Sequence, residues 1–175
     1  QEADSCLFKR RTDKNRKLVW NVEFETETHT DQLAKKLNTS AQTMSPDGVT
    51  LFCANDSDHY FIDSGSLVLR MTKDSTNNTF TTAPSLTTVD RMSFKHGYLE
   101  MRAKLPYMYG MWFSFWMQPD KKLLPEDFRY YGEIDIIETW WQSRSSYFAL
   151  YKWYDNYKGS ITQHENDVDT SRHEG

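Results

Sequence analysis

Three carboxylates alternate with isoleucines in the heptapeptide GEIDIIE at residues 132–138. Alternation of acidic and apolar residues is typical of a β-strand that buries one face and carries charge on the other. Acidic residues are poor strand formers, and like charges that share a face repel, so such a strand needs a functional reason to exist. The motif predicts a fold built on strands, with a candidate active site at Glu133, Asp135 and Glu138.

The position of the third carboxylate predicts an irregularity in this strand. Glu133 and Asp135 are two residues apart and share a face, whereas Glu138 comes one residue too late to join them. A β-bulge at Ile136 and Ile137 returns Glu138 to the acidic face, and bulges commonly re-aim side chains beside active sites. The alternative is an edge strand that uses charge against aggregation, with Glu138 pointing elsewhere.

Two upstream segments alternate in the same way. Residues 98–105 place polar side chains, among them Arg102, on one face and apolar side chains on the other. Residues 111–118 carry an apolar row on one face, and the other face holds Trp112, Ser114, Trp116 and Gln118. Indoles with hydrogen-bonding neighbours suit sugar rings, whose C–H groups pack on aromatic faces. The alternative for the two tryptophans is ordinary core packing.

Composition limits the classes of function. The chain has 175 residues, enough for one domain with a hydrophobic core, and its aromatic fraction of 15% favours an all-β protein. The net charge is −4, from 21 basic and 25 acidic residues, so no basic surplus indicates a nucleic-acid partner. The sequence has no apolar run of about 18 residues, and we therefore expect no membrane span.

Short strand candidates recur along the chain, and turn signals separate them. They cover residues 18–24, 49–53, 59–63, 66–72, 86–92, 97–105, 111–118, 133–138 and 146–153. Only 30–38 has the pattern of a helix. Many strands and one helix predict a sandwich or jelly roll of two antiparallel sheets, with residues 1–17 as a tail and 18–175 as the domain.

Three motifs in order resemble the family 16 glycoside hydrolases: YLEMRAKLP at 98–106, GMWFSFWMQ at 110–118 and GEIDIIE at 132–138. The resemblance implies a concanavalin-like β-jelly roll and retaining endo-hydrolysis of β-1,3- or mixed β-1,3/1,4-glucan, as in its laminarinase-like branch. A non-catalytic β-glucan recognition module and a hydrolase of an algal galactan, such as agarose or carrageenan, are the alternatives. The chain stops at Gly175, earlier than the resemblance implies, so we expect the domain to be incomplete at its C-terminus.

The resemblance also implies roles for single residues. Glu133 is the expected nucleophile, Asp135 the neighbour that holds and tunes it, and Glu138 the general acid/base. A retaining pair of carboxyl groups is expected about 5–5.5 Å apart. The expected substrate-binding residues are Trp112, Trp116, Arg102, Trp140 and Trp141, although the last two can equally be rim packing. The chemistry requires no redox cofactor or catalytic metal, and the resemblance allows a structural calcium.

A polymeric substrate cannot enter a cell, so we expect a secreted protein, acting as a monomer on a polysaccharide. Cys6 and Cys53 either form a disulfide or remain two separate thiols. A disulfide would imply an oxidising compartment. N-glycosylation patterns occur at Asn38, Asn55 and Asn77, a number close to chance in a chain rich in Ser and Thr.

Overall fold

A computed structural model describes residues 16–24, 30–40, 50–76, 79–106, 111–126, 128–139, 145–154, 159–160 and 166–169. Within these ranges the regular structure consists of β-strands and two short 3-10 helices, which confirms the predicted all-β class. The chain divides into two compact units, Gln1–Phe94 and Lys95–Gly175. No described helix has the length and hydropathy needed to cross a membrane.

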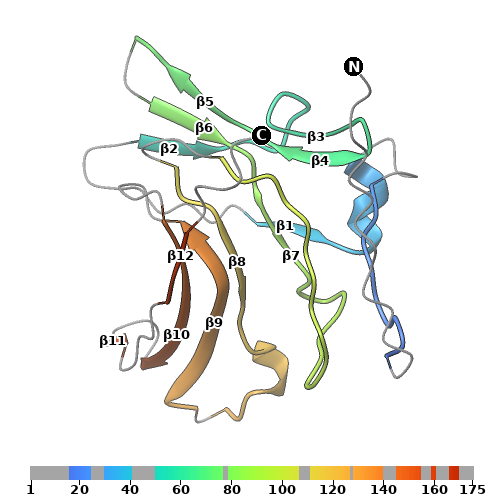
Figure 1. Cartoon of the computed structure of the whole chain (residues 1–175), viewed down its shortest axis with the longest axis vertical. Coiled ribbons are helices and arrows are strands. Elements are labelled where there is room, and N and C mark those ends of the chain that lie inside the picture. The colour runs from blue at the N-terminus through green and yellow to red at the C-terminus, as the bar shows by residue number, and fades with distance from the viewer. Residues whose placement is uncertain are drawn as a thin grey trace. The chain divides into compact units, whose positions relative to one another are not determined.

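The first unit contains small sheets. Its elements are η1 (Thr30–Lys35), β1 (Asn38–Ser40), β2 (Thr50–Cys53), β3 (Tyr60–Asp63), β4 (Ser66–Leu69), β5 (Met71–Asp74), β6 (Thr79–Thr82) and β7 (Ser85–Thr87). Among the described strands, β1 pairs with β7, β3 with β4, and β6 lies between β2 and β5 (Figure 1). The β2–β6 pair is parallel, which differs from the expectation that all pairs are antiparallel.

The predicted strand at 66–72 divides at Arg70. The Arg70 N–H donates to the carbonyl of His59 at 2.8 Å, whereas its carbonyl accepts from the N–H of Ala83 at 3.0 Å. Arg70 therefore bonds in turn to two different neighbours, so that β4 ends before it and β5 begins after it. The β3–β4 turn at Ser64 and Gly65 has φ values of 48° and 75°, as a tight two-residue hairpin requires.

A hydrophobic cluster anchors the first unit. Leu33, Tyr60 and Ala83 are buried, and Val22, Phe24, Ile62, Leu67 and Leu86 pack against them. Leu33 comes from the predicted helix, which is a 3-10 helix of six residues and ends before β1 begins at Asn38. So short a segment forms too few α-helical hydrogen bonds to offset the cost of nucleation.

Two predicted strands of this unit differ from the structure. Residues 18–24 form no strand; Leu18 and Val19 are exposed, and only the end of the segment reaches the cluster. The segment 86–92 is a strand only in β7, because the N–H groups of Arg91 and Met92 turn back to the carbonyl of Thr88. Cys53 is a free cysteine in the structure, and Cys6 lies outside the described residues, so their pairing stays a prediction.

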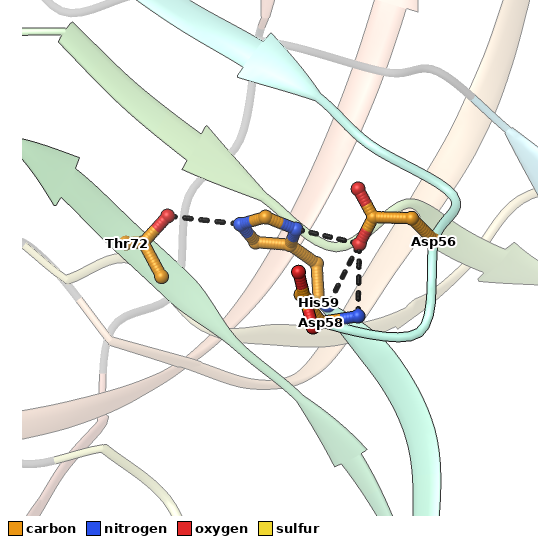
Figure 2. Close-up of polar contacts among 4 residues, drawn as sticks. All are labelled: Asp56, Asp58, His59 and Thr72. Atoms are coloured by element: carbon orange, nitrogen blue, oxygen red, sulfur yellow. Dashed lines mark hydrogen bonds and ion pairs between the residues drawn. The ribbon is translucent and has the colours of Figure 1, made fainter.

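A histidine joins the turn before β3 to strand β5. His59 Nδ1 lies 2.8 Å from Oδ1 of Asp56, and His59 Nε2 lies 2.8 Å from the Thr72 hydroxyl (Figure 2). The same Asp56 oxygen accepts the N–H groups of Asp58 and His59, each at 3.0 Å. These hydrogen bonds lower the pKa of Asp56, the side-chain bond from His59 being the largest cause. The cluster fixes the turn against the neighbouring strand.

The second unit is one curved antiparallel sheet. Its elements are β8 (Ser114–Met117), η2 (Lys121–Leu123), β9 (Tyr130–Thr139), β10 (Ser145–Tyr154), β11 (Gly159–Ser160) and β12 (Asn166–Asp169). Strand β9 lies between β8 and β10, and both β11 and β12 pair with β10 (Figure 1). The predicted strand at 97–105 is wrong: this segment has no described strand partner, and its apolar Met101 is 42% exposed.

Candidate active site

Strand β9 contains the predicted bulge. Asp135 lies opposite Trp116 of β8 and Ala149 of β10, whereas Glu138 lies opposite Ser114 and Tyr147. Between these two positions β8 and β10 each advance by two residues, whereas β9 advances by three. Strand β9 therefore carries one extra residue between Asp135 and Glu138. The prediction of a bulge at Ile136 and Ile137 is confirmed.

The bulge gathers the three carboxylates on one face of the sheet. Residues directly opposite one another in a sheet share a face, so Glu133, Asp135 and Glu138 lie between the rows of β8 and β10. Asp135 is 3% exposed and Glu138 is 8% exposed, whereas Glu133 is half-buried. Two of the carboxyl groups are therefore removed from water beside a third.

Burial and mutual repulsion raise the proton affinity of this set. Burial is the largest cause that raises the pKa of Asp135 to about 7, and the charges of Glu138 and Glu133 add to it. The pKa of Glu138 is also raised, chiefly by burial and further by the charge of Glu133, although a hydrogen bond from Trp112 opposes the shift. Such interacting carboxyls titrate as a set, and at least one of them retains a proton near neutral pH.

The row beside β9 contributes two hydrogen bonds to the carboxylates. Trp112 Nε1 donates to Oε1 of Glu138 at 2.7 Å, and Gln118 Nε2 donates to Oε2 of Glu133 at 2.7 Å. Trp116 lies on the same face, opposite Asp135. The alternation in 111–118 thus predicted the right face for Trp112, Trp116 and Gln118, but it did not predict these two bonds, which depend on the pairing of β8 with β9.

Strand β10 adds aromatic side chains that the sequence reasoning missed. Tyr147 lies opposite Glu138, Tyr151 opposite Glu133, and Trp153 opposite Tyr131. The rings of Tyr151 and Trp153 stack with centroids 5.3 Å apart and planes inclined by 23°. The alternation that places Tyr147, Ala149, Tyr151 and Trp153 on one face of a strand was the sequence signal that could have identified them. Aromatic side chains thus flank the carboxylates on both sides.

Comparison with known proteins agrees with this arrangement. The profile described as Glycosyl hydrolases family 16 matches residues 48–173, well over half of the chain. The chain belongs to glycosyl hydrolase family 16. The family's jelly-roll fold agrees with the all-β structure, and the matched residues include the whole carboxylate strand.

A curated relative shares part of the family 16 domain. The Endo-1,3-1,4-beta-glycanase ExsH of Rhizobium meliloti (strain 1021) is 36% identical over 87 residues, which are 50% of this chain and 17% of that protein. The chain thus spans less than a fifth of the length of this relative. No solved structure gives a significant match.

Of the residues expected to bind substrate, Arg102 is described and lies apart from the carboxylates, whereas two others lie outside the described residues. Arg102 is exposed in the irregular segment before β8, and no described contact joins it to the carboxylates. Trp140 and Trp141 lie outside the described residues, so their role stays a prediction. Within the described ranges no group of three or more His, Cys, Asp or Glu side chains is arranged to hold a metal ion, and the structural calcium stays a prediction.

Replacing Asp135 by Asn is expected to stabilise the family 16 domain above neutral pH. The native carboxyl has a pKa of about 7, against 3.8 as the ordinary value, so the folded state binds a proton that the unfolded state has lost. The free energy of unfolding therefore falls as the pH rises from about 3.8 to about 7. An asparagine does not titrate, so the variant does not lose this stability. Melting temperatures of both proteins from about pH 4 to about pH 9 should converge at the acid end and favour Asp135→Asn at the alkaline end. Equal curves would contradict the assignment.

Proposed function

We propose that this domain hydrolyses internal bonds of β-1,3- or mixed β-1,3/1,4-glucan with retention of the anomeric configuration. The observation that carries the proposal is the set of three carboxylates which the bulge brings to one face. Family membership supports glycan hydrolysis in general, and the name of the partial relative, an endo-1,3-1,4-beta-glycanase, supports a β-1,3/1,4-linked glycan. The carboxyls of the set that are ionised repel an anionic polymer, which favours a neutral polysaccharide over a sulfated galactan such as carrageenan.

In the proposed first step, the carboxylate of Glu133 attacks the anomeric carbon and forms a glycosyl ester. The bond from that carbon to the bridging oxygen breaks, and Glu138 donates its proton to this oxygen, so that the leaving sugar departs as an alcohol. The raised pKa of Glu138 suits a group that must hold a proton before the reaction.

In the second step, Glu138 acts as a base. It removes a proton from water, the water oxygen attacks the anomeric carbon, and the ester bond to Glu133 breaks. Two inversions give net retention, and both carboxyls return to their starting states. Asp135 touches neither bond; its burial between the other two sets how many protons the set holds.

The aromatic rows supply the binding face. Trp116 lies on one side of Asp135, and Tyr147 and Tyr151 lie on the other side of the carboxylate strand. Pyranose rings pack on such faces, while the carboxyls meet the bond to be broken. We also propose that the enzyme acts outside the cell, since a polymeric substrate cannot cross a membrane. We propose further that it acts as a monomer.

The test is incubation of the purified protein with laminarin, barley β-glucan, agarose and carrageenan, with reducing ends and early proton NMR as readouts. The expected result is release of reducing sugar from laminarin or barley β-glucan, with β-anomers appearing first. Early α-anomers would contradict retention. Binding of laminarin without turnover would favour a recognition module, and turnover of agarose or carrageenan instead would favour a galactan hydrolase.

A further inference from the structure

The two outer carboxylates are each bonded through one oxygen to the same neighbouring row. Trp112 donates to Oε1 of Glu138, and Gln118 donates to Oε2 of Glu133, both at 2.7 Å. The two donors are six residues apart from each other in the sequence and lie on the face that also carries Trp116. The two bonds therefore hold the ends of the carboxylate set from one side of the sheet.

Hydrogen-bonded backbone supports both donors. Phe113, next to Trp112, donates its N–H to Oγ1 of Thr139 at 2.9 Å and accepts the N–H of Thr139 at 2.8 Å. Gln118 directly follows Met117, which pairs with Ile134 of β9. Trp112 and Gln118 thus flank β8 (Ser114–Met117) at its two ends, where hydrogen bonds to β9 hold the backbone beside them. Side chains supported in this way can hold a reacting group more precisely than side chains on a free loop.

The chemistry of the donors determines which carboxyl oxygen remains for the reaction. An indole N–H and an amide N–H only donate, and the unprotonated oxygen of a carboxyl group is the better acceptor, so each bond favours a proton on the other oxygen. In Glu138 the bond from Trp112 favours the proton on Oε2, and in Glu133 the bond from Gln118 leaves Oε1 for attack. Neither of these two oxygens has a described hydrogen bond within the second unit.

We infer that Trp112 and Gln118 are positioning residues that hold the general acid and the nucleophile, respectively, and select the reactive oxygen of each. This inference rests on the proposed function and changes the expected role of Trp112, for which the sequence suggested sugar binding or core packing. The two bonds act on different halves of the same step: one directs proton donation, and the other directs attack. The leaving group of the substrate separates these halves, because a good leaving group needs no proton.

The experiment measures kcat/KM of Gln118→Leu and Trp112→Phe on two substrates: laminarin, and 2,4-dinitrophenyl β-laminaribioside, whose leaving group needs no proton. kcat/KM reports the first bond-breaking step alone. Gln118→Leu is expected to lose about tenfold on both substrates, since attack is impaired in each case. Trp112→Phe is expected to lose about tenfold on laminarin and less than about twofold on the aryl glycoside.

The pH profile supplies a second readout. The Trp112 bond opposes the rise in the pKa of Glu138, so Trp112→Phe should move the alkaline limb of the laminarin profile to higher pH. Trp20→Phe in the first unit repeats the indole-to-phenyl change at a residue with no described hydrogen bond to the carboxylates, and it should leave kcat/KM unchanged.

The outcomes separate this inference from the proposed function. Unchanged kcat/KM in both variants of an active protein would overturn it. Equal losses on both substrates in both variants, with lowered melting temperatures, would overturn it as well, since they would show a structural role alone. A wild-type protein that cleaves neither substrate would overturn the proposed function, and this inference with it.

Discussion

Glu133→Ala is expected to lower the rate of laminarin hydrolysis by about 10⁴-fold or more, because no other group can form the glycosyl ester. Added azide should restore turnover of an aryl β-laminaribioside and yield the α-glycosyl azide. The small anion occupies the space of the lost carboxylate and attacks from the same face, so only one inversion takes place. Product NMR measures the configuration of the azide.

The matched control for this variant is Glu126→Ala, which removes an exposed glutamate outside β9. Its rate should equal that of the wild type, and azide should have no effect on it. A Glu133→Ala protein that folds normally and keeps more than about a tenth of the rate would show that Glu133 is not the nucleophile.

Glu138→Ala is expected to lose about 10²–10⁴-fold on laminarin, which needs a proton on its leaving oxygen. The loss of kcat/KM on a 2,4-dinitrophenyl glycoside should be far smaller, because that leaving group departs unaided. Azide should accelerate this variant and yield the β-glycosyl azide, since it attacks the ester on Glu133 from the side that Glu138 has vacated. An α-azide from Glu138→Ala together with a β-azide from Glu133→Ala would show that the two roles are exchanged.

A third substitution affects the whole carboxylate set. Asp135→Asn should retain part of the activity and change the pH dependence of kcat/KM, because it removes the carboxyl whose pKa is raised to about 7 from a set that titrates together. An unchanged pH profile would mean that Asp135 does not titrate with the other two carboxyls.

The faces of the strands could be predicted from local pattern alone. Side chains alternate along any strand, so the row of Trp112, Trp116 and Gln118 followed from counting residues. The bulge followed from the same count, because Glu138 is one residue out of phase with Asp135 and a carboxylate facing the core would be costly. Register with β8 and β10 then confirmed it.

Pairing partners could not be predicted in this way. Polar and apolar residues alternate in 97–105 as regularly as in β8, yet this segment pairs with no described strand. Alternation predicts which side chains share a face, but it does not predict which strand lies alongside. Arg70 divides one predicted strand into two, since its N–H and carbonyl bond to different neighbours. The parallel pairing of β2 with β6 likewise depends on contacts between distant segments.

The sequence by itself determined that this chain is an all-β protein with three carboxylates placed to share one face of a strand, because these features depend on periodicity along the backbone. Only the tertiary structure decided that Trp112 and Gln118 bond to Glu138 and Glu133, and that Tyr151 lies opposite Glu133. Each of these contacts joins β9 to residues of a neighbouring strand or to residues that flank it, and depends on the register between the two strands. A shift of one residue would turn the side chains to the other face, and no local pattern specifies that register.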